Sequence, residues 1–132
     1  MTTKLLRVTS TPIAMEWIEK LKVQHGPLMF HQSGGCCDGS APMCYPRYEF
    51  KIGDQDVFLG LLGDTPFYIS GSQFEYWRHT QLVIDVVPGR GSGFSVESPE
   101  GIRFITRSHV FTDEEMHQLI NQGEPPRGPQ SC

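Results

Sequence analysis

The architecture is best inferred from the stretch Thr11-Pro-Ile-Ala-Met-Glu-Trp-Ile-Glu-Lys-Leu-Lys-Val-Gln-His-Gly-Pro-Leu-Met-Phe30. Thr11 suits a helix N-cap, and Pro12 suits the first helical turn. Charged residues occupy the face opposite the apolar one. The apolar residues that recur at helical spacing are Ile13, Ala14, Trp17, Ile18 and Leu21. Gly26-Pro27 ends the pattern, and Leu28-Met-Phe30 is a short apolar strand. We therefore expect a helix that leads directly into a strand.

The rest of the chain has mostly the period of strands. The expected strands are residues 48–52, 57–62, 66–69, 82–87, 94–97 and 102–106. Turns are expected at Gly53-Asp54 and Gly63-Asp64. Capping patterns predict short helices after Ser70, through His79, and after Thr112, to about residue 120. This order of elements predicts an α+β fold with a mostly antiparallel sheet.

Size and composition favour one domain. The chain has 132 residues, of which 38% are hydrophobic, enough for a core without disulfides or metals. We expect residues 1–120 to form a single globular domain. Residues 121–132 contain three prolines and two glycines with almost nothing apolar, so a disordered tail is expected there.

Charge and hydropathy exclude several classes of partner. The net charge is −4, and no basic stripe offers a surface to a phosphate backbone, so no nucleic-acid partner is expected. No apolar run approaches the roughly 20 residues that cross a bilayer, and the first residues lack a signal-peptide pattern. We therefore expect a cytoplasmic protein with no membrane partner. In a reducing compartment the four cysteines are ligands, redox groups or core thiols rather than disulfides.

The most unusual segment is His31-Gln-Ser-Gly-Gly-Cys-Cys-Asp-Gly-Ser-Ala-Pro-Met-Cys-Tyr45. It holds three of the four cysteines. Thiolates are soft ligands for zinc, iron and iron–sulfur species, and glycines allow neighbouring thiols to turn toward one centre. The candidate metal ligands are Cys36, Cys37, Cys44 and His31. The glycines expected to shape the loop are Gly34, Gly35 and Gly39.

Four further residues are supporting candidates: Asp38, Tyr45, His79 and Asp85. Asp38 and Tyr45 flank the cysteines. His79 closes an expected helix, where the helix dipole also favours a cation. Asp85 interrupts an apolar run, so it is either paired or on an exposed edge.

Two other interpretations of the loop stay open. Backbone amides in such a loop can lower a thiol pKa, which would suit a thiol-based enzyme or redox protein that uses Cys36 or Cys37, with a nearby histidine as base. Alternatively, the cysteines are small buried hydrophobes in a tight turn. The protein would then be an interaction module with structural cysteines.

Several of these segments resemble the bacterial domain-of-unknown-function family 779, over about residues 8–115. The segments that carry the resemblance are His31–Ser40, Pro42–Tyr45, Gln73–Thr80 and Ile84–Gly89. Members of that family are often encoded beside aldehyde or alcohol dehydrogenases. The resemblance therefore implies such a dehydrogenase as the partner, but it names no reaction.

The order of motifs is also similar to that of the A-type iron–sulfur carriers. The matching motifs are Cys37-Asp-Gly39, Gly53-Asp54, the helix after Ser70, Ile84-Asp85 and Gly93-Phe-Ser-Val-Glu-Ser-Pro99. This similarity implies a HesB-like fold, a small twisted β-sandwich or barrel with flanking helices, and a homodimer that shares a site. The carriers end in a Cys-Gly-Cys pair, whereas residues 101–107 contain no cysteine. Cys36 and Cys44 would have to replace that pair.

Together these observations predict a metal-binding or iron–sulfur accessory protein that serves an aldehyde or alcohol dehydrogenase. The expected cofactor is a zinc or iron ion or an iron–sulfur cluster. The thiol-based enzyme and the interaction module are the alternatives.

Overall fold

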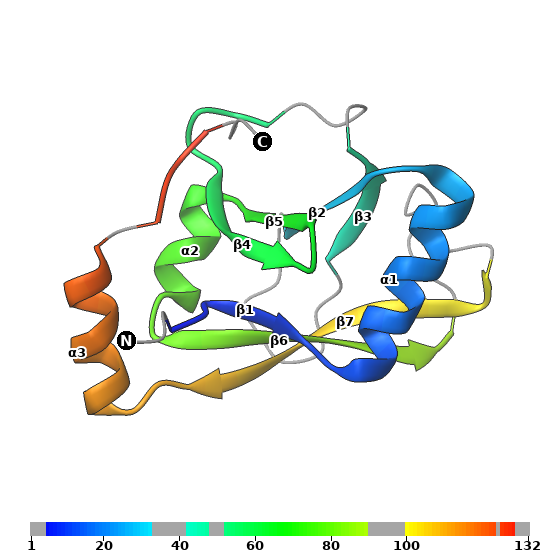
Figure 1. Cartoon of the computed structure of the whole chain (residues 1–132). Coiled ribbons are helices and arrows are strands. Elements are labelled where there is room, and N and C mark those ends of the chain that lie inside the picture. The colour runs from blue at the N-terminus through cyan, green and yellow to red at the C-terminus, as the bar shows by residue number, and fades with distance from the viewer. Residues whose placement is uncertain (1–4, 33–41, 48–51, 90–99, 124, 129–132) are drawn as a thin grey trace.

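The computed structural model describes residues 5–32, 42–47, 52–89, 100–123 and 125–128. Figure 1 shows the arrangement of the helices and strands. In chain order the elements are β1 (Val8–Ser10), α1 (Pro12–His25), β2 (Leu28–Gln32), β3 (Met43–Pro46), β4 (Val57–Leu62), β5 (Thr65–Ile69), α2 (Gly71–Trp77), β6 (Thr80–Pro88), β7 (Ile102–Val110) and α3 (Asp113–Gln122).

The predicted first helix and the strand after it are confirmed. The Ala14 backbone N–H donates to the Thr11 hydroxyl over 3.3 Å at the N-cap. Gly26 ends α1 with a φ of 81°, a conformation that favours glycine. The helix buries Ala14, Ile18 and Leu21, as its period predicts. Ile13 is the exception in the apolar pattern, since it is half-exposed.

The strands form two mixed sheets, in which most strand pairs are antiparallel as expected. The first sheet has the order β3-β2-β5-β4, and the second has the order β1-β6-β7. The pairs β2–β5 and β1–β6 are parallel, and the other three pairs are antiparallel. The parallel partners are far apart in sequence, as Val8 and Leu82 show. Local periodicity carries no information on such pairings, so the sequence did not predict the two parallel pairs.

The two sheets pack face to face through aromatic side chains. The rings of Phe30 and of Phe104 in the other sheet are perpendicular, with 5.0 Å between their centroids, and Phe67 stacks beside Phe30. Next to these rings the Thr106 hydroxyl donates to the buried Gln32 side-chain oxygen over 3.0 Å. The expected α+β sandwich is therefore present, but the described strands do not close into a barrel.

In the second half of the chain, both predicted helices are present, and one predicted strand is longer than expected. Gln73 N–H donates to the Ser70 hydroxyl, and α2 ends at Trp77, two residues before His79. Thr112 forms the predicted capping box at the start of α3. β7 continues to Val110 and pairs with all of β6. The predicted strand at 94–97 lies outside the described residues, as do residues 48–51 of the predicted strand 48–52. The sequence did not predict β1 and β3.

Part of the expected disordered tail has regular contacts. α3 continues through Gln122, and residues 125–128 then run beside the start of β4 (Figure 1). Phe58 N–H donates to the Pro126 carbonyl over 2.9 Å, and Gly128 N–H donates to the Asp56 carbonyl over 2.8 Å. Backbone hydrogen bonds to an edge strand need no apolar side chains, so the composition of this segment did not indicate them. Across the parts of the chain that the structure describes, no helix is long and apolar enough to cross a membrane.

Candidate functional site

Strands β2 and β3 fix both ends of the cysteine-rich segment. The segment leaves β2 after Gln32 and enters β3 at Met43, and His31 pairs with Met43 across the two strands. Residues paired in this way lie about 5 Å apart, so the segment starts and finishes at one end of the sheet. Six predicted site residues lie outside the described residues: Gly34, Gly35, Cys36, Cys37, Asp38 and Gly39.

His31 is held against a carboxylate that the sequence analysis did not include. The His31 side chain is 5% exposed, and its Nε2 lies 3.0 Å from Oδ1 of Asp56, which is itself 16% exposed. The other carboxylate oxygen, Oδ2, accepts from Gly53 N–H over 2.8 Å. The Asp56 carboxylate therefore faces the Nε2 edge of the imidazole at ion-pair distance. The only sequence signal for Asp56 was its place just after the expected Gly53-Asp54 turn.

The face of the sheet around His31 is aromatic. His31 pairs with Tyr68 of β5, and Tyr68 pairs in turn with Phe58 of β4. The Phe58 and Tyr68 rings lie 5.5 Å apart. Tyr45 lies on the same face, two residues from the partner of His31, and burial raises the pKa of its hydroxyl. In such surroundings of low polarity, the His31–Asp56 contact is stronger than it would be in water.

Cys44 lies on the opposite face of this sheet. It pairs with Phe30, it is fully buried, and it belongs to the hydrophobic core between the sheets. Successive residues of a strand point to opposite faces, so the side chains of His31 and Cys44 do not converge. The structure thus corrects the expectation that these two residues share one centre, and gives Cys44 a packing role.

Asp85 is held in a different network, in the second sheet. Its Oδ1 accepts from the Thr11 hydroxyl over 2.9 Å, and its Oδ2 lies 2.7 Å from Nε of Arg107. The Arg107 hydrogen bond is the main reason why the pKa of Asp85 lies below its ordinary value. These contacts join the N-terminus of α1 to β6 and β7. Asp85 therefore supports the fold, while the loop residues 33–41 that it was expected to support lie outside the described residues.

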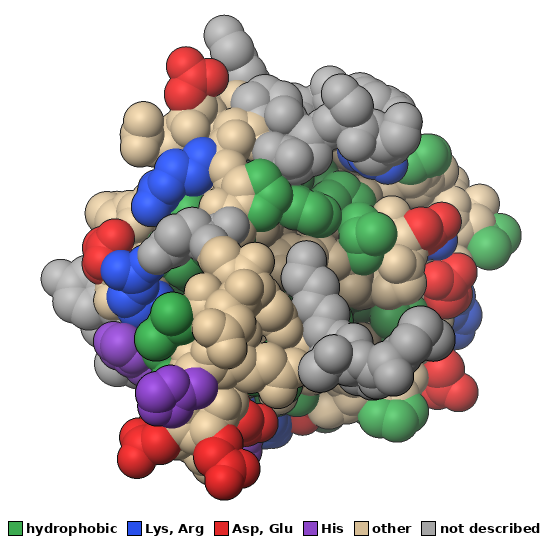
Figure 2. All heavy atoms as spheres, turned by 60° about the vertical axis from the view of Figure 1, so that its left-hand side comes forward, with side chains coloured by type: hydrophobic (Ala, Val, Ile, Leu, Met, Phe, Trp, Pro, Cys, Tyr) green, Lys and Arg blue, Asp and Glu red, His purple; other side chains and the backbone are tan. Residues whose placement is uncertain are grey.

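His79 is also separate from His31. Ser70, which precedes α2, donates its N–H to the Gln32 carbonyl at the end of β2, whereas His79 follows the far end of that helix. The His79 side chain is exposed and lines a cavity of about 420 Å³ with Arg7, Arg78 and residues of α3. Figure 2 shows the side of the molecule on which histidine and basic side chains gather near acidic ones. The loop residues 33–41 that His79 was expected to support lie outside the described residues.

The described residues do not by themselves form a metal site. Among them, no group of three or more histidine, cysteine, aspartate or glutamate side chains is placed to hold a metal ion. What they do supply is one buried imidazole at the start of the cysteine-rich segment, with a partly buried carboxylate beside it. Such a pair can orient a metal-binding histidine or a general base.

A comparison with models of protein families finds a match for this chain. The model of the family described as Domain of unknown function (DUF779) matches residues 17–110. The chain belongs to this family. The match covers His31, Asp56 and all of the cysteine-rich segment, and it confirms the first of the two resemblances. No curated protein and no solved structure matches the chain.

Proposed function

We propose that this DUF779 protein binds a metal ion or an iron–sulfur species through Cys36, Cys37 and His31, and that it works as an accessory protein. The observation that carries the proposal is the 3.0 Å approach of His31 Nε2 to Asp56 Oδ1. Histidines that bind metals almost always direct their second ring nitrogen to a carboxylate, a carbonyl or a water, which fixes the ring and raises its basicity. Nδ1 of His31 would then face the metal.

The donor set suits zinc or iron. Two thiolates and one imidazole are common ligands for zinc, and thiolates with imidazole also hold iron–sulfur clusters. Three protein ligands leave one position open on a tetrahedral ion. Cys44 is left out of this set because its side chain packs in the core. An open position suits exchange with a second protein, and the order of motifs shared with the A-type carriers supports the iron–sulfur version.

The client that we propose is an aldehyde or alcohol dehydrogenase. The support is the resemblance to a family whose members are often encoded beside such enzymes. The test mixes loaded protein with metal-depleted dehydrogenase, separates the two by gel filtration and measures metal in each fraction. Metal that moves to the dehydrogenase supports this client, and metal that stays behind contradicts it.

The same contact also favours a second function. Cys36 or Cys37 would be a nucleophile, His31 its base, and Asp56 the residue that orients the base. This is the arrangement of a thiol-based enzyme. The two functions differ in whether the thiolates bind a metal or one of them acts as a free nucleophile.

Metal analysis of the full chain, purified without oxygen, separates the candidates. Binding predicts about one metal ion or cluster per chain, retained in Cys132→Ala and lost in Cys37→Ala. A metal-free protein with one thiol that alkylates rapidly at neutral pH, and more slowly in His31→Gln, indicates the thiol-based enzyme. A metal-free protein with unreactive thiols contradicts both and leaves the interaction module.

A further inference from the structure

The outward face of α1 has no part in the proposed function. Figure 1 shows α1 at the right of the molecule, with α2 and α3 toward the left. The inner face of α1 buries Ala14, Ile18 and Leu21, whereas Ile13 and Val23 on the outward face are 50% and 88% exposed. Single exposed apolar side chains are common on protein surfaces. Whether these two belong to an interface depends on the residues between them.

Four side chains of α1 form a regular stripe along the outward face. All four are exposed, and the intervals between them are three, four and three positions. Residues at this spacing lie on one side of a helix, and they are the residues that face a partner helix in a coiled coil. We call them the α1 stripe: Ile13, Glu16, Lys20 and Val23. The stripe is apolar at both ends and charged in the middle.

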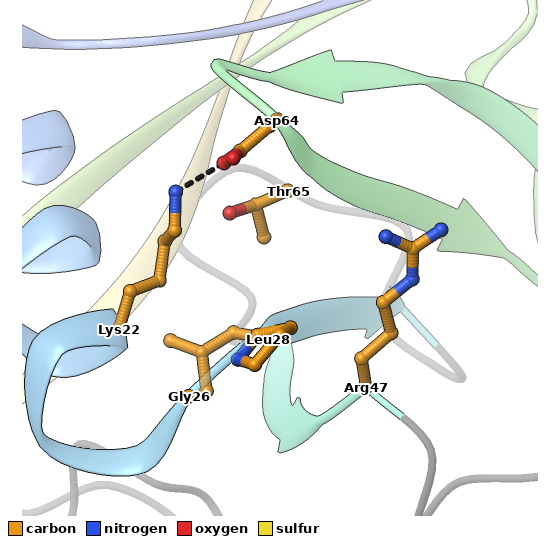
Figure 3. Close-up of a pocket in the computed structure, with 7 residues that line it drawn as sticks. Lys22, Gly26, Leu28, Arg47, Asp64 and Thr65 are labelled. Carbon is orange, nitrogen blue, oxygen red and sulfur yellow. Dashed lines mark hydrogen bonds and ion pairs between the residues drawn. The ribbon is translucent and has the colours of Figure 1, made fainter. Parts of the chain in front are cut away.

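The charged side chains of α1 nearest to the stripe are paired within the chain. Lys22 points toward Asp64 in the turn between β4 and β5, at the edge of a cavity of about 290 Å³ (Figure 3). The Lys22 Nζ also lies 3.4 Å from Oε1 of Glu19. These three side chains form one ion-pair cluster that joins α1 to the turn. Glu16 and Lys20, the charges of the α1 stripe, lie outside this cluster.

Glu16 and Lys20 do not pair with each other, although a lysine four positions after a glutamate is well placed to do so. The Lys20 Nζ instead lies 4.6 Å from the centre of the Trp17 ring. Within the described residues, the Glu16 carboxylate has no ion pair or hydrogen bond. A partner that carries the same two charges in the reverse order can therefore pair with both.

We propose that the α1 stripe is the contact surface of a homodimer, in which α1 packs antiparallel against α1 of a second copy. In one antiparallel register, Ile13 lies beside Val23 of the second copy, and Glu16 lies beside Lys20 of the second copy. Two-fold symmetry repeats each contact, which gives apolar contacts at the ends and opposite-charge contacts in the middle. The stripe is therefore complementary to itself, which identifies the partner as a second copy. The interface contains no residue of the proposed metal site.

Sedimentation equilibrium of the full chain at low ionic strength tests the proposal. We expect a reversible monomer–dimer equilibrium that weakens as salt is added, because the charged contacts are at the surface. Glu16→Lys and Lys20→Glu each replace both opposite-charge contacts by like-charge contacts, so each should weaken the dimer about tenfold. Val23→Ser removes both apolar contacts and should also weaken it. Mixing Glu16→Lys with Lys20→Glu should restore dimers, because the facing charges of the two chains are again opposite.

Glu114→Lys makes the same charge change at an exposed position of α3, so it is the matched control and should dimerise like the wild type. All the substituted residues are exposed, and circular dichroism should show a folded protein for every variant. The proposal is overturned if the chain is monomeric at every concentration or if the α1 variants dimerise like the wild type. It is also overturned if mixing the two charge variants restores no dimer, or if Glu114→Lys weakens the dimer as much as Glu16→Lys.

Discussion

His31 Nε2 lies 3.0 Å from Asp56 Oδ1, and three separate segments hold this pair. His31 belongs to β2, and Asp56 precedes β4, the far strand of the same sheet. Gly53 N–H donates to the Asp56 carboxylate, and Gly128 N–H donates to the Asp56 carbonyl. The segment after α3 therefore helps to position a residue of the candidate site, although its composition is that of a tail.

The first prediction concerns the carboxylate of this pair. Asp56→Asn keeps the shape of the side chain and an oxygen for Gly53 N–H, but removes the charge beside His31. We expect metal affinity to fall by about 10- to 100-fold, the usual effect of losing such a partner. Competition with a chromophoric chelator measures this change.

Asp54→Asn is the matched control for that experiment, because Asp54 is an exposed carboxylate two residues away. It should bind metal like the wild type. Equal affinity in Asp56→Asn and the wild type would contradict the role assigned to His31 as a ligand oriented by Asp56. Equal losses in both variants would point to a general effect of charge.

The second prediction concerns Cys44. Because its thiol packs in the core against the Phe30 side of the sheet, Cys44→Ala should lower the free energy of unfolding by about 1 kcal/mol. The metal content should not change. Urea unfolding and metal analysis of the same preparation measure the two quantities. Loss of metal with unchanged stability would indicate instead that Cys44 is a metal ligand.

The third prediction concerns the pH dependence that Asp85 confers. The Arg107 hydrogen bond is the main cause that lowers the pKa of Asp85 from its ordinary value of 3.8. A lowered native pKa stabilises the fold above the unfolded pKa, and this contribution is lost as the pH falls through the native value. Asp85→Asn should therefore be less stable than the wild type at pH 7, by about 1 kcal/mol since solvent screens the half-exposed Arg107.

Urea unfolding between pH 7 and pH 2 checks this expectation. The difference between the two proteins should be constant down to about pH 5 and should shrink below about pH 4. In an Arg107→Gln background the Asp85 substitution should have a smaller effect, because its main partner is gone. A difference that grows as the pH falls would have the wrong sign and would reject the assignment.

Local patterns in the sequence predicted the helices well, because caps and periodicity are local. The predicted N-caps are all confirmed, at Thr11, Ser70 and Thr112. The same reasoning missed β1 and β3, which have three and four residues and too few alternations to show a period. The parallel pairs were missed because they join distant segments.

The site was predictable only in part, for a related reason. The order of strands brings Asp56 next to His31. The two residues are 25 positions apart, and no local sequence pattern links them. Cysteine is both a soft ligand and a small hydrophobe, so composition alone could not assign Cys44. Its register with Phe30 decides the question, because that register sets which face of the sheet it occupies.

The last prediction uses Gly71, the first residue of α2. A Cβ at this position would lie 2.7 Å from the Gln55 carbonyl oxygen and 2.9 Å from Nη1 of Arg127. The arginine end can move away, but the Gln55 backbone must shift, and Gln55 immediately precedes Asp56. Helix propensity alone predicts that Gly71→Ala stabilises the protein, by less than the roughly 1 kcal/mol of a helix interior because Gly71 is the first residue of α2. The clash predicts a loss of about 1–3 kcal/mol, so we expect net destabilisation.

The same substitution should also disturb the candidate site, because a shift of Gln55 moves the carboxylate that faces His31. We expect weaker metal binding in Gly71→Ala, with a smaller loss than in Asp56→Asn, whose charge is removed altogether. Ser72→Ala, at the exposed next position of α2, is the control and should change neither property. If Gly71→Ala were more stable than the wild type and bound metal equally well, the close packing of α2 on the Asp56 segment would have no part in holding His31 and Asp56 together.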